Sequence, residues 1–141
     1  MAEIITGYCA ISADILHIGH IIFLQKCRQK CDFLWVGVMS DEYIRDVKKR
    51  DPIMPWVERS EIVRMLRPVD GVMKQEAFEF DIKTLREVYN IDVIIDSEEH
   101  KKARTGADII IYFFLGEREG GTSSTEIRKK IYETYNSPRP V

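Results

Sequence analysis

The sequence lacks long apolar segments and lacks an excess of either charge. No stretch reaches the roughly 20 residues that a membrane helix needs, and no basic segment precedes the apolar residues that begin at Ile4, so we predict no signal peptide. With 21 Lys and Arg against 23 Asp and Glu, the formal net charge is −2, which gives no reason to expect a polyanionic partner. We therefore expect a cytoplasmic protein that binds neither a membrane nor a nucleic acid.

Cysteine is also scarce. The three cysteines, Cys9, Cys27 and Cys31, are too few and too unevenly spaced for a disulfide framework, which fits a reducing cytoplasm. Together with His17 and His20 they include the ligand types of a zinc site. However, Cys27 and Cys31 fall one turn apart inside a predicted helix, which is the wrong spacing for a usual structural site. We interpret the cysteines as buried or half-buried thiols, predict no protein-bound metal, and keep zinc binding as an alternative.

The chain is too short for two domains of ordinary size. Its 141 residues, 45% hydrophobic and 31% charged, suit one compact globular domain with its own core. The last residues, 136–141, include two prolines and are typical of a linker. We predict one domain over residues 1–135 and a tail at 136–141 that would suit fusion to a further C-terminal domain.

Short apolar runs alternate with segments of helical spacing along the whole chain. Strands are predicted at residues 3–10, 33–38, 71–73, 91–95 and 108–114. Helices are predicted at residues 18–31, 56–66, 80–89 and 124–135, with a glycine-rich loop at 116–122. This alternation predicts a three-layer α/β domain built on a mostly parallel sheet of about five strands.

Local signals give finer predictions for the middle of the chain. Asp41 is predicted to cap a helix that follows the second strand. Residues 45–56, basic and broken by prolines, are predicted to form a loop. Trp35 is assigned to the core, whereas Trp56 either packs over a substrate or anchors that loop. The residues of the 56–66 helix predicted to face inward are Val57, Ile62, Val63 and Leu66.

Two histidines stand at the predicted start of the first helix, in the sequence His-Ile-Gly-His at 17–20. In a parallel sheet this place adjoins the carboxyl end of a strand, where a helix N-terminus offers unpaired N–H groups to anions. A spacing of three puts His17 and His20 on the same side of the first turn, and Gly19 lets a phosphate approach the backbone. The pattern favours a triphosphate site whose imidazoles stabilise the charge that develops at the α-phosphate. A pair of surface or helix-capping histidines is the structural alternative.

Two signatures in the chain resemble those of a known superfamily. The stretch Ser-Ala-Asp-Ile-Leu-His-Ile-Gly-His at 12–20 resembles the first signature of the HxGH nucleotidyltransferase superfamily. The stretch Thr-Ser-Ser-Thr-Glu-Ile-Arg at 122–128 is similar to its second signature, I-S-S-T-x-x-R. The resemblance runs from residue 4 to about residue 133 and implies a Rossmann-like nucleotidyltransferase fold.

The middle of the chain narrows the resemblance to the short cytidylyltransferases that act on glycerol 3-phosphate, phosphocholine or phosphoethanolamine. The matching segments are Val-Gly-Val-Met-Ser-Asp-Glu at 36–42, Glu-Arg-Ser-Glu-Ile-Val at 58–63 and Leu-Arg-Pro-Val-Asp-Gly-Val at 66–72. The Ser-Ala-Asp-Ile form of the first signature also resembles the nucleotidyltransferase domains fused to phosphoenolpyruvate mutase in phosphonate pathways. The resemblance therefore implies transfer of CMP from CTP to a small phosphate or phosphonate, with release of pyrophosphate.

The resemblance also implies a role for each matching residue. His17, His20 and Lys48 are the catalytic candidates, and Arg50 and Arg59 the candidates for binding the acceptor. The residues implied to bind the nucleotide are Ser12, Ala13, Asp14, Gly19, Asp96, Arg118, Thr122, Ser123, Ser124 and Thr125. The acceptor's own anionic oxygen serves as nucleophile, so Asp14 is expected to orient the loop and not to act as a general base. Mg²⁺ is expected with the triphosphate, and a homodimer is expected from the family.

Two positions depart from the family pattern, and other functions stay open. Ile11-Ser12-Ala13 stands where relatives carry a glycine, so the loop is expected to take another path or Ser12 to supply the contact. Asp96 is shifted by one from the aspartate that contacts cytosine in the family. An adenylyltransferase of the nicotinamide-mononucleotide or pantetheine-phosphate kind, using ATP, and a non-catalytic nucleotide-binding module are the alternatives. No motif identifies the acceptor.

Overall fold

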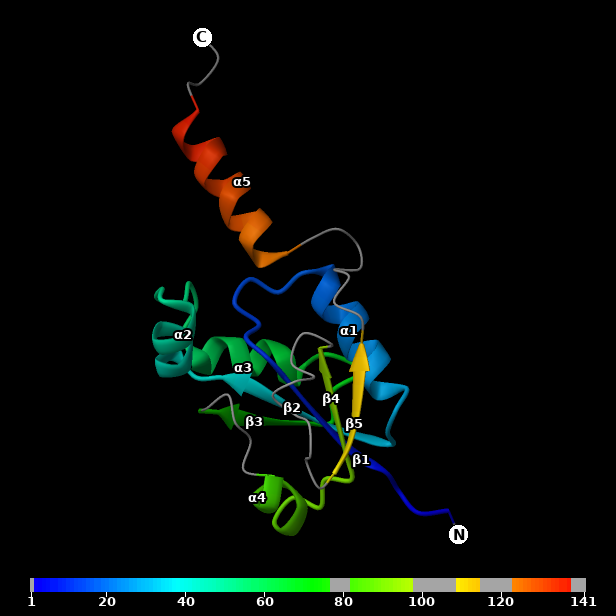
Figure 1. Cartoon of the computed structure of the whole chain (residues 1–141). Coiled ribbons are helices and arrows are strands. Elements are labelled where there is room, and N and C mark those ends of the chain that lie inside the picture. The colour runs from blue at the N-terminus through cyan, green and yellow to red at the C-terminus, as the bar shows by residue number, and fades with distance from the viewer. Residues whose placement is uncertain (1, 77–81, 98–108, 115–122, 138–141) are drawn as a thin grey trace.

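The computed structural model describes residues 2–76, 82–97, 109–114 and 123–137 (Figure 1). The strands are β1 (Thr6–Ile11), β2 (Phe33–Met39), β3 (Gly71–Gln75), β4 (Val93–Ser97) and β5 (Ile110–Phe114). The helices are α1 (Ile18–Arg28), α2 (Asp41–Lys48), α3 (Trp56–Arg64), α4 (Ile82–Glu87) and α5 (Ser124–Asn136). Within these described ranges, no helix is both long and apolar enough to span a bilayer.

The five strands form one sheet in the order β3-β2-β1-β4-β5, and every neighbouring pair is parallel. This confirms the predicted α/β class and strand number. The chain runs outward from β1 through β2 to β3 and then returns to the other side of β1 as β4. The strand order therefore reverses between β1 and β4, and ligands of open α/β sheets bind outside the carboxyl ends of the strands at such a switch point.

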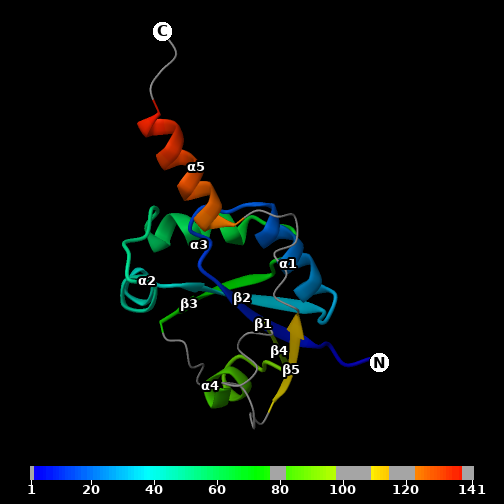
Figure 2. The same cartoon turned by 45° about the horizontal axis from the view of Figure 1, so that its top comes forward.

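Helices cover both faces of the sheet (Figures 1 and 2). Side chains alternate along a strand, so β1 sends Cys9 and Ile11 to one face and Tyr8 to the other. The first face packs against α1 and α3 through Leu24 and Val63. The second packs against α4, whose buried contribution is Leu85. These are the three layers that the sequence predicted.

The three cysteines lie in the first of these cores, and all three are free and buried, as the sequence indicated. Burial raises the pKa of Cys27 far above that of an ordinary thiol and raises the pKa of Cys31 to about 11. A thiol that holds its proton is a poor nucleophile and a poor metal ligand. Cys27 and Cys31 therefore act as small apolar residues of the core, in which Cys9 is buried as well.

The prediction of a loop over residues 45–56 was wrong at its start, because α2 continues to Lys48. Ser40 caps this helix by accepting the N–H of Tyr43 at 3.0 Å, and Asp41, the predicted cap, is the first helical residue. The structure also places Ile44 and Tyr43 in the core. Burial of these two side chains stabilises a short helix whose other residues are mostly charged.

The inward face of α3 also differs from the prediction. Val63 is buried and Leu66 packs against the core, but Val57 is 66% exposed and Ile62 is 41% exposed. The buried residues of α3 are Arg59, Ser60 and Val63. The helix is therefore turned so that an arginine faces the core, which its apolar pattern could not indicate.

Gly37 of β2 leaves the space through which Tyr8 reaches across the sheet. The Tyr8 hydroxyl donates to the side-chain oxygen of Gln75 at the end of β3, and both residues are buried. A Cβ at Gly37 would stand 2.7 Å from the Tyr8 Cζ. We expect Gly37→Ala to lower the free energy of unfolding by about 1–3 kcal/mol, measured by urea denaturation. The loss should be smaller in a Tyr8→Phe background, and equal losses in both backgrounds would contradict this explanation.

Candidate active site

The two histidines meet at the start of α1. The backbone N–H of Gly19 donates to His17 Nδ1 at 3.1 Å, and the backbone N–H of His17 donates to His20 Nδ1 at 3.2 Å. The ring centroids lie 4.0 Å apart. Because each Nδ1 accepts a hydrogen bond, a neutral ring must carry its proton on Nε2. The helix cap thus fixes both imidazoles as Nε2–H donors, so the capping role and a phosphate-binding role are compatible.

His20 is held in its neutral form. Burial, reinforced by the nearby His17 and Lys48, lowers the pKa of His20 from 6.5 to about 4. At neutral pH its imidazole is therefore a neutral donor. A neutral donor can stabilise a phosphate oxygen while adding no charge to the site.

The same shift predicts a pH dependence of stability. Between pH 6.5 and pH 4 the unfolded chain binds a proton at His20 that the folded protein does not, so the free energy of unfolding falls as the pH drops through this range. From pH 7 to pH 5 the loss due to His20 should be about 2 kcal/mol. Urea denaturation at both pH values should show this extra loss in the wild type relative to His20→Asn. Equal losses in the two proteins would refute it.

Asp14 lies at the centre of the loop between β1 and α1 and is fully buried. Its carboxylate accepts Arg50 Nη1 at 2.7 Å, the N–H of Ile53 at 3.0 Å and the N–H of Met54 at 3.1 Å. Burial alone would raise the pKa of Asp14, but these donors and the charge of Arg50 outweigh it and lower the pKa. Asp14 is therefore an ionised anchor between two loops.

The backbone on either side of Asp14 is strained. Ala13 has a φ of 53° and Ile15 a φ of 70°, which is the left-handed region that β-branched residues rarely adopt. Such strain persists only where the surroundings fix the backbone, and it gathers at functional sites. Ile11, which stands where the resemblance implied a glycine, lies in β1, and the left-handed conformations fall at Ala13 and Ile15.

Three cations from two segments of the chain gather around Asp14. Lys48 Nζ lies 3.4 Å from Ser12 Oγ, Arg50 pairs with Asp14, and Arg128 Nη1 lies 3.9 Å from Asp14 Oδ2. Burial lowers the pKa of Lys48, and the charges of Arg50 and Arg128 lower it further. The three cations are therefore close enough to repel one another. A single buried carboxylate offsets three positive charges, which leaves an excess suited to phosphate groups.

The second signature reaches this site through the start of α5. Ser124 Oγ donates to the carbonyl of Ile15 at 3.2 Å, which joins residues 109 positions apart. Ser123 caps α5 by accepting the N–H of Glu126 at 3.1 Å. Thr125 is exposed in the first turn. The two signatures thus lie side by side, each at the N-terminus of a helix.

Arg128 is the functional candidate that sequence reasoning missed, although it is the last residue of the second signature. Its side chain is 25% exposed, yet its Nη1 is buried and has no hydrogen-bond partner among the described residues. A buried guanidinium N–H without an acceptor is costly. A phosphate oxygen in the site would supply that acceptor.

The other predicted residues are placed as follows. Asp96 lies near the carboxyl end of β4, beside β1, and its Oδ1 accepts the N–H of Ser97 at 2.7 Å. Trp56 packs against the core and its Nε1 donates to the carbonyl of Val38 at 3.0 Å, which favours the anchoring role. Arg118 and Thr122 lie outside the described residues.

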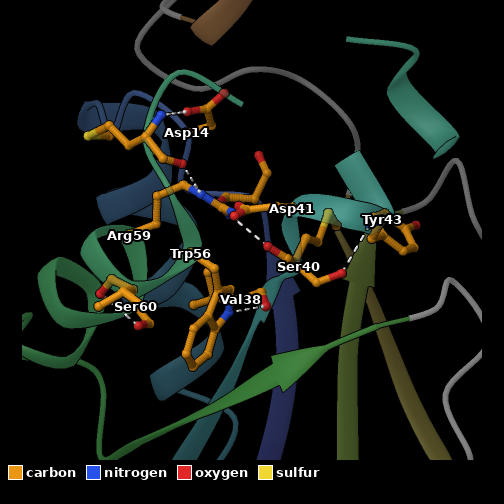
Figure 3. Close-up of polar contacts among 12 residues, drawn as sticks. Asp14, Val38, Ser40, Asp41, Tyr43, Trp56, Arg59 and Ser60 are labelled. Atoms are coloured by element: carbon orange, nitrogen blue, oxygen red, sulfur yellow. Dashed lines mark hydrogen bonds and ion pairs between the residues drawn. The ribbon is translucent and has the colours of Figure 1, made fainter. Parts of the chain in front are cut away.

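The side chain of Arg59 is not available to bind an acceptor substrate. It is fully buried, and three of its nitrogens donate to backbone carbonyls or to Asp41 (Figure 3). A substrate phosphate could contact it only after these hydrogen bonds break. The predicted contact between Arg59 and the acceptor does not fit this arrangement.

Two adjacent imidazoles, of which His20 is held neutral, and a cluster of cations lie at the switch point of a parallel sheet. These are the groups that bind and polarise a nucleotide's phosphates. The fold and the site thus define a nucleotidyltransferase-type α/β protein. A sequence profile of the cytidylyltransferase-like family matches residues 12–130, and the chain belongs to that family.

Similar proteins come from several organisms. An FAD synthase of Thermococcus sibiricus is 35% identical over 132 residues, covering 86% of this chain and 88% of the relative. An FAD synthase of Thermococcus onnurineus is 31% identical over 133 residues, covering 86% and 87%. A bifunctional protein HldE of Nitratiruptor is 34% identical over 121 residues, covering 84% of this chain and 26% of that protein. The crystal structure of a lipopolysaccharide core biosynthesis protein from Thermoplasma volcanium shares the fold, with a TM-score of 0.63 and 24% identity over 79% of this chain and 94% of that one.

Proposed function

We propose that this chain is an adenylyltransferase that transfers AMP from ATP to the phosphate of FMN, forming FAD and pyrophosphate. The observation that carries the proposal is the meeting of the two signatures around a cluster of cations. The choice of ATP and FMN rests on the FAD synthases, which match this chain along most of both lengths. The relatives therefore support the ATP alternative over the CTP that the sequence placed first.

The reaction needs positioning and charge stabilisation more than proton transfer. An anionic oxygen of the acceptor phosphate attacks the α-phosphorus of ATP, a new P–O bond forms, and the P–O bond to pyrophosphate breaks. His17 and His20 would donate from Nε2 to oxygens around the α-phosphate. Lys48, Arg50 and Arg128 would hold the remaining phosphate charge. Asp14, which is hydrogen-bonded to three donors and has a lowered pKa, is proposed to orient the loop and not to act as a base.

Magnesium is proposed as a partner of the nucleotide and not as a resident ion. In the part of the chain that the structure describes, no three His, Cys, Asp or Glu side chains gather as a metal site. Mg²⁺ often binds mainly through substrate phosphates and water. It would neutralise the triphosphate and assist departure of pyrophosphate. Homodimerisation, a cytoplasmic location and a fused C-terminal domain stay predictions.

A cytidylyltransferase is the second candidate, favoured by the family to which residues 12–130 belong and by Asp96 beside the switch point. Its acceptor would be glycerol 3-phosphate, phosphocholine, phosphoethanolamine or an alkylphosphonate. The test is incubation with each of the four nucleoside triphosphates, Mg²⁺ and each acceptor, with pyrophosphate release as readout. We expect release with ATP and FMN, together with FAD. Turnover with CTP alone would overturn the proposal, and nucleotide binding without turnover would indicate a binding module.

A further inference from the structure

The backbone of Met54 is held on both sides of its Cα by buried residues of opposite charge. Its N–H donates to Asp14 Oδ1 at 3.1 Å, and its carbonyl accepts Arg59 Nε at 2.9 Å. The side chains of Asp14 and Arg59 are both 0% exposed. Met54 lies in the segment between α2 and α3, four residues after Arg50.

Arg59 also joins this segment to the carboxyl ends of two strands. Its Nη1 donates to the carbonyl of Ser12, just after β1, at 2.6 Å, and to the carbonyl of Met39, at the end of β2, at 2.7 Å. Its Nη2 pairs with Asp41 at the start of α2 at 2.6 Å (Figure 3). One guanidinium thus fixes β1, β2, α2 and the segment after α2 relative to one another. Lysine, with one nitrogen on a flexible stem, cannot reproduce this fork.

The residues that Arg59 holds in place adjoin the proposed phosphate-binding residues, Lys48 and Arg50. Ser12 precedes Asp14 and is the neighbour of Lys48. The segment from Lys48 to Met54 begins at the end of α2, passes through Lys49 with a φ of 55°, and includes Arg50. Without a fixed point at Met54, Lys48 and Arg50 would depend on exposed contacts and on Asp14 alone.

We propose that Arg59 is a positioning residue, which with Asp14 clamps the Met54 backbone and so holds Lys48 and Arg50 at the phosphates. The kinetic part of this inference rests on the proposed nucleotidyl transfer. The structural part does not, because it concerns only how the chain holds its own segment.

The test uses the full chain with Arg59→Lys and Asp41→Asn, and with Arg64→Lys as matched control. Arg64 lies on the same helix, is 46% exposed and pairs only with Glu61 among the described residues. Three quantities are measured: hydrogen exchange at the Ile53 and Met54 amides, affinity for Mg²⁺-pyrophosphate by calorimetry, and kcat and KM with ATP and FMN.

For Arg59→Lys we expect exchange at the Ile53 and Met54 amides to rise about tenfold more than exchange at β2 amides such as Val36. Pyrophosphate affinity should fall severalfold, and kcat about tenfold or more with a smaller change in the KM for ATP. Asp41→Asn should give the same pattern at about a third of the size, and Arg64→Lys should match the wild type.

Three results would overturn the inference: an unchanged kcat in a folded Arg59→Lys protein, exchange that rises equally in β2 and at Met54, or a change confined to the KM for FMN. The last would restore Arg59 as an acceptor ligand. If Arg59→Lys does not fold, Asp41→Asn decides by the same criteria. If the wild type has no turnover, the proposed function fails, while exchange and pyrophosphate affinity still decide the clamp.

Discussion

Replacing His20 by asparagine is expected to lower turnover about 10²–10³-fold while the protein stays folded. Asparagine offers an oxygen near the position of Nδ1, so it can still accept the N–H of His17 that caps α1. It has no group at the position of Nε2, so the proposed donor to the α-phosphate is lost. The measurement is pyrophosphate release under saturating nucleotide, with circular dichroism as the check on folding.

The control for this substitution is His100→Asn, because that third histidine belongs to neither signature. It should leave turnover within about twofold of the wild type. A folded His20→Asn protein with near wild-type turnover would remove His20 from the mechanism. The capping hydrogen bonds at the start of α1 would then be its whole role.

Replacing Asp14 by alanine is expected to lower the free energy of unfolding by about 3–5 kcal/mol. The substitution leaves Arg50 and the N–H groups of Ile53 and Met54 without their acceptor in a buried place. It also removes the contacts that hold Ala13 and Ile15 in their left-handed conformations, so the loop loses its fixed geometry. Urea denaturation measures the loss, and turnover should collapse as well because the loop before His17 is no longer fixed.

Asp51→Ala provides the matched comparison. Asp51 also pairs with an arginine, Arg45, at 2.9 Å, but its side chain is 86% exposed. Exposed pairs contribute little, so this substitution should change stability by less than about 1 kcal/mol. Similar losses for Asp14→Ala and Asp51→Ala would show that burial of the Asp14 carboxylate does not carry the effect we assign to it.

The strands were predictable because both faces of the sheet are covered. A parallel strand buried on both faces is a continuous apolar run, and β2 at Phe33–Met39 is one. The place of His17 followed from the same logic, since the helix after a parallel strand begins at the carboxyl edge of the sheet. These signals are local, so the sequence alone can carry them.

The orientation of α3 was not predictable in the same way. Val57 and Ile62 suggest an apolar face, but α3 turns Arg59 inward instead. The hydrogen bonds that make this favourable come from Ser12, Met39 and Met54, and they exist only once the fold has assembled. A buried arginine is stable only when its donors are satisfied, and a sequence pattern does not indicate acceptors on other segments.

The segment around Lys48 and Arg50 shows a similar limit on prediction from sequence. The resemblance implied a catalytic role for Lys48 and acceptor binding for Arg50, and the structure brings both beside Asp14. The sequence reasoning did not select Arg128, although the second signature ends on it, and the structure places Arg128 with them. That convergence depends on Ser124 meeting the carbonyl of Ile15, a contact between segments that share no local pattern.

The position of helix α5 affects where the protein can be tagged or immobilised. Its 13 residues include none that is buried, and Figure 1 shows it extending away from the sheet and the other helices. At 1.5 Å per residue it spans about 20 Å, with Ser124 and Arg128 at the site and Asn136 at the far end. An affinity tag placed after Asn136 would therefore stand clear of the nucleotide. Fixing that end to a surface, however, would restrain the helix that presents Arg128, so immobilisation through the amino terminus is the better choice.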